Sequence, residues 1–197
     1  MHTRTIPTPR LLTLFRALAA GLLTLAAMPA QSALNVYLEL TANGESIAGE
    51  TTLGSVGGLD VTDMIECHAV NHEMFASFDT STGRLTGQLN HAPFKIVKRV
   101  DKASPLIAKA LSNNEVIEAR FRYFRPNPSG DGTTQQYFTI ELSGGRVSGL
   151  RHWTPNNLDP AGSAYPYMEE VSFVYERITI RYEDGGIEHL IDVSAAQ

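Results

Sequence analysis

Two histidines, His68 and His72, have a spacing that could bind a metal ion, and Glu73 follows the second of them. Residues four apart lie on one face of a helix or of a strand, so both imidazoles would point the same way. Zinc sites use imidazoles at such spacings. However, the carboxylate is not placed as in the metalloprotease helix motifs, and no third ligand is evident. We therefore expect hydrogen-bonded structural histidines and no metal site.

Other motifs for catalysis are missing from the sequence. It contains no Gly-x-Ser-x-Gly, and the segment Ser143-Gly-Gly-Arg-Val-Ser-Gly149 has a strand-like composition that does not suit a nucleophile elbow. No glycine-rich phosphate-binding loop precedes the expected helix. Glu169 and Glu170 are neighbours in an expected strand, so their carboxylates face opposite sides and cannot share one substrate. We predict no catalytic residue, no cofactor and no enzymatic activity.

Cys67 is the only cysteine, so an intrachain disulfide is impossible and packing alone must hold the fold together. It shares an expected strand face with Ile65 and Ala69. We expect a small buried apolar side chain, and a reactive thiol is the alternative.

The charge of the chain is unevenly distributed. Residues 1–32 contain three arginines and no acidic residue, and the rest of the chain has 13 basic and 21 acidic residues, a net charge of −8. Nucleic-acid binding draws most of its affinity from neutralising phosphates with basic side chains. The composition therefore argues against a nucleic-acid partner.

Residues 1–32 have the pattern of a secretory signal peptide. An arginine-rich start is followed by an apolar run over residues 17–27 and by small residues around Ser32 and Ala33, where we expect cleavage. The run of 11 residues is too short to span a bilayer, so we expect no stable membrane insertion. The alternative is an upstream extension in front of a true start at Met28.

The remaining chain alternates in the manner of strands. Apolar and polar residues alternate over 34–41 and again over 117–123, which predicts two half-buried strands. One helix is expected around residues 104–112, with Ser104 as its cap, Pro105 in the first helical position and a left-handed Asn113 at its end. Its apolar stripe, which must pack on the sheet, consists of Leu106, Ile107, Ala110 and Leu111.

Turn residues divide the other strands. We expect one hairpin across residues 143–145 and a second across 184–185, with a bulge near Glu176 or Arg177. Seven or eight short strands and one helix suggest a sandwich or a closed barrel with the helix on its side. Residues 47–60 are expected to form an exposed excursion, in which the glycines are Gly49, Gly54, Gly57 and Gly58.

Three motifs, taken in order, resemble the haemolysin-coregulated protein (Hcp) family of type VI secretion. They are Gly83-Arg-Leu-Thr-Gly87, His91-Ala-Pro-Phe94, and Asp101 followed by Ser104-Pro105-Leu106. The resemblance extends over roughly residues 34–193. It implies a mainly β fold, an antiparallel β-barrel of two sheets with one flanking helix, which makes residues 33–197 a single domain.

The resemblance also implies a function. Members of the family form rings of six that stack into a tube, which is expelled with a tip spike protein and carries effector proteins in its lumen. In the family, the counterpart of the excursion with Gly49, Gly54, Gly57 and Gly58 reaches a neighbouring subunit.

Residues 1–32 depart from the family, whose members leave the cell without a signal peptide. The alternative function is therefore an Hcp-like binding module that a signal peptide exports to the periplasm or the outside. We expect a secreted protein, periplasmic if the signal peptide is used, and cytoplasmic before export if Met28 is the true start.

Overall fold

Strand β1 (Val36–Ala42) lies in the interior of the main sheet, between β5 (Ile65–Asn71) and β9 (Ile117–Pro126). The computed structural model describes residues 36–154, 156, 158 and 166–193. Leu38 and Leu40 are buried, whereas Glu39 and Thr41 are partly exposed, as the alternation predicts. Strand β9 has the same pattern, so both expected strands are confirmed within these residues.

The strands of the main sheet form a circuit of pairings. From β1, antiparallel pairings lead through β5, β8 (Phe94–Arg99) and β11 (Met168–Val174) to β10 (Thr134–Trp153), and from there through β9 back to β1. Strands β12 (Arg177–Tyr182) and β13 (Ile187–Asp192) branch from β10. The expected antiparallel barrel is present as this circuit, but the sheet as a whole does not close, because its last strand, β13, pairs only with β12 and leaves an open edge.

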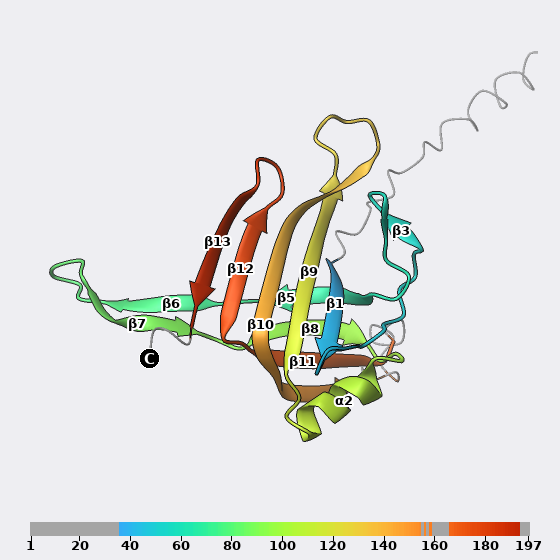
Figure 1. Cartoon of the computed structure of the whole chain (residues 1–197), viewed down its shortest axis with the longest axis horizontal. Helices are drawn as coiled ribbons and strands as arrows, with labels where there is room; N and C mark the ends of the chain where they lie inside the picture. The colour runs from blue at the N-terminus through green and yellow to red at the C-terminus, as the bar shows by residue number, and fades with distance from the viewer. Residues whose placement is uncertain (1–35, 155, 157, 159–165, 194–197) are drawn as a thin grey trace, which may run out of the picture. The chain divides into compact units, whose positions relative to one another are not determined.

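Figure 1 shows this arrangement in the unit to which all described residues belong, Leu34–Gln197. Strands β1, β9, β10, β12 and β13 stand next to one another, and β5, β8 and β11 cross behind them. The core between the two groups contains a stacked aromatic pair, Phe94 on β8 and Phe121 on β9, with ring centroids 4.4 Å apart. The short strand β2 (Glu45–Ser46) pairs with β1, and β3 (Ser55–Val56) and β4 (Leu59–Asp60) form a separate two-stranded sheet.

The prediction of a hairpin across residues 143–145 is wrong. The chain continues through Gly144 and Gly145 as the single strand β10, which has 20 residues. Its register shifts between Leu142 and Gly145 and again between Val147 and Gly149, so the strand bends instead of reversing. One half of β10 pairs with β9 and β12, and the other half pairs with β11.

The second expected hairpin, β12–β13, is confirmed. The expected bulge near Glu176 or Arg177 is instead a complete break between β11 and β12, since these two strands pair with different halves of β10.

Helix α2 (Ser104–Ser112) is the only helix in the described part of the chain, and no helix there is long and apolar enough to cross a bilayer. Ile107 and Ala110 are buried in the core, while Leu106 faces outward. The expected caps are wrong. The hydroxyl of Ser104 does not cap the helix, because it accepts from the N–H of Asp101 and donates to Glu169, and the left-handed residue is Asn114 instead of Asn113.

A buried ion cluster fixes the start of the helix to the sheet. The ammonium of Lys98, on β8, lies 2.5 Å from Glu169 Oε1 and 2.7 Å from Asp101 Oδ1. Lys98 and Glu169 are both fully buried. Asp101 Oδ1 also accepts from the N–H of Ala103, and Ser104 Oγ lies 2.9 Å from Glu169 Oε1. The cluster therefore connects β8, β11 and the first turn of α2.

Candidate functional site

The hairpin of β6 (Met74–Phe78) and β7 (Leu85–His91) extends away from the main sheet (Figure 1). Within the described residues, these two strands pair only with each other. The turn between them is built by Asp79, whose carboxylate accepts from both the N–H and the hydroxyl of Ser81, and by Gly83 at a positive φ of 67°. The sequence was not expected to form a hairpin here.

Four large apolar side chains of the hairpin are exposed, between 40% and 63%: Phe75, Phe78, Leu85 and Leu89. Phe75 lies opposite Asn90, and Leu89 lies opposite Ala76. Because neighbouring residues of a strand point to opposite faces, Phe75 is on one face of the hairpin and Leu89 is on the other. The hairpin thus offers apolar surface on both of its faces.

One hydroxyl group contacts the two histidines at the base of the hairpin, before β6 and at the end of β7. His72 precedes β6, His91 ends β7, and Tyr175 lies between β11 and β12. The Tyr175 hydroxyl is 2.8 Å from His72 Nε2 and 2.9 Å from His91 Nδ1. Burial raises the pKa of Tyr175 to about 12, so it stays protonated. We call these three residues the hydroxyl hub.

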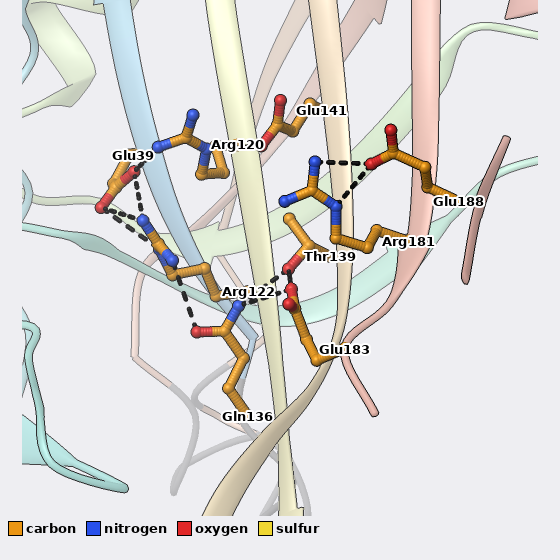
Figure 2. A network of polar contacts seen from close by, with 9 residues as sticks. All are labelled: Glu39, Arg120, Arg122, Gln136, Thr139, Glu141, Arg181, Glu183 and Glu188. Atoms are coloured by element: carbon orange, nitrogen blue, oxygen red, sulfur yellow. Dashed lines mark hydrogen bonds and ion pairs between the residues drawn. The ribbon is translucent and has the colours of Figure 1, made fainter. Parts of the chain in front are cut away.

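A second surface is the charged face of the main sheet, shown in Figure 2. Arg122 on β9 pairs with both carboxylate oxygens of Glu39 on β1, at 3.0 and 3.1 Å. Arg120 pairs with Glu141 on β10 at 2.8 Å. Exposed pairs of this kind contribute at most about 1 kcal/mol each to stability. The charged face comprises Glu39, Arg120, Arg122, Gln136, Thr139, Glu141, Arg181, Glu183 and Glu188.

The charged face surrounds a shallow depression of about 400 Å³ next to β12. On its far side, Arg181 pairs with Glu188 of β13 at 2.6 Å, and this hydrogen bond raises the pKa of the guanidinium. Glu183 accepts from the hydroxyl of Thr139 and from the amide of Gln136. Charges of both signs therefore alternate over five neighbouring strands, β1, β9, β10, β12 and β13, an arrangement suited to contact with water.

The excursion over residues 47–60 is folded onto its own chain. A Cβ at Gly49 would lie 2.6 Å from the Cα of Ile65, and one at Gly57 would lie 2.8 Å from the carbonyl oxygen of Thr134. Only Gly54 and Gly58 have open space beside them. The contact of Gly49, Gly54, Gly57 and Gly58 with a neighbouring subunit stays a prediction. The element that extends furthest from the sheet is the β6–β7 hairpin (Figure 1).

The two histidines considered for a metal site have different surroundings. His72 belongs to the hydroxyl hub, and its partners are His91 and Tyr175, which are distant in the sequence. Burial lowers the pKa of His68, which is not part of the hub. Among the described residues, no group of three or more His, Cys, Asp or Glu is arranged to hold a metal ion.

Two further expectations concern Cys67 and the N-terminal segment. Cys67 is buried, which confirms the expected small buried side chain, and burial raises the pKa of its thiol far above the ordinary value. Ser32 and Ala33, where cleavage is predicted, lie outside the described residues, so the signal peptide stays a prediction.

Sequence reasoning missed the hairpin and its hub. The apolar residues Phe75, Phe78, Leu85 and Leu89 flank a run of turn formers, and this arrangement was the available signal. Nothing in the local sequence indicates that Tyr175 lies between His72 and His91, because that contact depends on the pairing of β11 with β8.

The comparisons with known proteins agree on one family. The family model for the type VI secretion system effector Hcp matches residues 37–182. The chain is 31% identical over 156 residues to the Major exported protein of Pseudomonas aeruginosa, a match that covers 76% of this chain and 90% of that protein.

Solved structures give the same result. The fold is similar to a double tryptophan variant of Hcp1 from the E. coli EAEC 042 pathovar, with a TM-score of 0.68 and 28% identity, over 82% of this chain and 99% of that one. It is also similar to the secreted protein Hcp3 of Pseudomonas aeruginosa, with a TM-score of 0.61 and 25% identity, over 81% and 98% of the two chains. The circuit of strands, the single flanking helix and these matches together lead to one conclusion: the chain belongs to the Hcp family of type VI secretion system proteins.

Proposed function

We propose that this chain is the tube subunit of a type VI secretion system, forming rings of six that stack and are exported. Its partners are further copies of itself, a spike tip protein, and effector proteins carried in the lumen. It works as a structural protein, without catalysis, cofactor or nucleic acid. Membership of the Hcp family supports the proposal, and the observation that carries it is the exposed apolar hairpin β6–β7.

The hairpin needs a partner for physical reasons. A two-stranded hairpin is marginally stable in water by itself, and this one pairs with no other described strand. Burying one large apolar side chain contributes about 1.5–3 kcal/mol, and four such side chains are exposed here. Apolar side chains on both faces are best covered by two surfaces at once, which closely packed subunits provide. We therefore assign the hairpin to the contact between subunits.

The charged face has the opposite character. Its arginines and glutamates are paired within the subunit and remain partly exposed, so covering them with an apolar surface would cost desolvation without new pairing. We assign this face to a wall of the ring that stays in contact with water.

Ring formation is testable on the purified chain beginning at Ala33. Light scattering at micromolar concentration is expected to give the mass of six subunits in moderate salt. The fraction of rings should rise with salt, because each subunit then carries a net charge of −8 and salt screens the repulsion. A monomer in moderate salt, with intact β-type circular dichroism, would contradict the proposal.

A second candidate function follows from residues 1–32. Their arginines, apolar run and small residues favour an Hcp-like module that a signal peptide exports to the periplasm or the outside.

Mass spectrometry of the mature N-terminus separates the two routes of export. If the signal peptide is used, the protein in the periplasmic or culture fraction begins at Ala33. A cytoplasmic protein that begins at Met28, or a stable one that retains Met1, would show instead that no signal peptide is cleaved.

A further inference from the structure

The chain connects the hairpin to β5 and β8 of the main sheet, and the hydroxyl hub adds a side-chain link at this base. His72 and His91 lie at the two ends of the hairpin, next to a backbone hydrogen bond from the N–H of Ala92 to the carbonyl of Glu73, at 3.0 Å. Their shared partner, Tyr175, follows directly after β11, a strand of the main sheet. Any change at this hydroxyl therefore acts on both ends of the hairpin together.

The hub depends on the protons that it holds. A phenol has one hydrogen to donate and also accepts, so with two neutral imidazoles it donates to one ring and accepts from the N–H of the other. One added proton is tolerated, because the phenol oxygen then accepts from both rings. A second proton brings two positive imidazolium groups to the same oxygen, which both His72 Nε2 and His91 Nδ1 already approach within 2.9 Å.

The surroundings of the hub favour its neutral form. Burial is the main cause of the lowered pKa of His72, and the charge of His91 is the second cause. Burial also lowers the pKa of His91. The apolar ring of Phe94, on β8, packs against His72, with ring centroids 5.1 Å apart. The uncharged ring of Tyr175, which follows β11, also contacts His72. No carboxylate contributes to the pKa shift of either imidazole.

We propose that the hydroxyl hub is a pH-dependent fastener of the β6–β7 hairpin, which holds the hairpin in its assembling position at neutral pH and releases it on mild acidification. The regulatory part of this inference rests on the proposed function, since the released hairpin would no longer hold subunits together. His72, His91 and Tyr175 are then positioning residues of the assembly surface.

The direction of the effect follows from linkage. A histidine whose pKa is lower in the fastened state than in the released state stabilises the fastened state fully above its ordinary pKa of about 6.5. This contribution is lost as the pH falls from that value toward the lowered pKa of the fastened state. Release is therefore expected below about pH 6.5, and not at alkaline pH.

Hydrogen exchange at the hairpin tests the proposal. Amide exchange over residues 74–91, corrected for its intrinsic pH dependence, is expected to rise about threefold or more between pH 7.5 and pH 5.5. Exchange in β1 and β9 should not change. The double variant His72→Gln with His91→Asn keeps amide donors and removes both titrating groups, so its hairpin exchange should be independent of pH.

Two more variants complete the test. Tyr175→Phe removes the shared hydroxyl, and its hairpin should already exchange fast at pH 7.5. His68→Gln is the matched control, because the pKa of His68 is also lowered but this residue lies outside the hub, and this variant should keep the pH dependence of the wild type. Circular dichroism of each variant confirms that the main sheet is folded.

Unchanged hairpin exchange in the wild type at pH 5.5, or a pH dependence that persists in the double variant, would overturn the proposal. The readout does not require a ring, so a chain that stays monomeric still tests the hub. If rings form and hairpin exchange responds to pH while the rings persist at pH 5.5, the link between hub and assembly is wrong.

Discussion

Replacing Lys98 by methionine is expected to lower the free energy of unfolding by about 3–5 kcal/mol, because it leaves a buried charge without its partner. Lys98 Nζ contacts the carboxylates of Glu169 and Asp101 and also donates to the carbonyl of Arg99. Methionine has a similar volume but no charge. Without the ammonium, the fully buried Glu169 keeps only Ser104 as a hydrogen-bond donor to Oε1.

The other oxygen of Glu169, Oε2, lies 2.9 Å from His152 Nε2, which forms an ion pair with it only when the imidazole is protonated. Urea unfolding followed by circular dichroism at pH 7.5 measures the loss. Combining Lys98→Met with Glu169→Gln should recover part of the stability, since an amide does not require a counter-charge.

Lys102→Met is the matched control for Lys98. The ammonium of Lys102 lies 2.9 Å from Asp63 Oδ1, but this pair is exposed, so its loss should change the free energy of unfolding by less than about 1 kcal/mol. Equal effects of the two substitutions would show that the buried cluster does not support the fold as described.

Replacing Phe78 and Leu85 by serine is expected to convert rings into monomers while the fold is kept. The two side chains lie directly opposite each other on the hairpin, and both are more than half exposed in the single chain. If each contributes about 1.5–3 kcal/mol when a neighbour covers it, the association constant per contact falls by about two to four powers of ten. Light scattering and circular dichroism measure the two effects separately.

Leu53→Ser distinguishes the hairpin from the glycine-containing excursion over residues 47–60. Leu53 is about half exposed and lies within that excursion. Its replacement should leave rings intact if the hairpin makes the main contact. Dissociation by Leu53→Ser, with rings retained in the Phe78 and Leu85 double variant, would assign the contact to the excursion instead.

The strands with one solvent-exposed face could be predicted from the sequence. In β1 from Leu38 and in β9 up to Phe121, buried and more exposed residues alternate, because one face packs on the core and the other holds Glu39 and Arg120 in water. The β12–β13 hairpin could also be predicted, because its turn contains Gly185, which has a positive φ of 80°.

Other features depended on contacts between distant residues. On β8, the inward positions are Phe94, Ile96 and Lys98, so the buried third position is a lysine whose partner, Glu169, is 71 residues away. The next apolar residue of this phase, Val100, is exposed. The glycine pair at 144–145 indicated a turn because nothing local reveals that β9, β11 and β12 all need β10 as a partner.

The hairpin β6–β7 was missed because the usual pattern is absent from it. A strand with one covered face alternates, whereas a hairpin that has apolar residues on both faces does not. Phe75 and Leu89 therefore looked like scattered apolar residues in a turn-rich segment.

The position of β1 has a consequence for the time at which the chain folds. This first strand pairs along its whole length with β9, so that Val36 lies beside Tyr123 and Ala42 beside Ile117. Contacts between residues so far apart in sequence form slowly, because a long loop must close before they contribute. A chain emerging from the ribosome therefore cannot complete its central sheet until the second half has been made. During that interval its apolar strands are exposed, which leaves time for a translocase or a chaperone to bind the nascent chain.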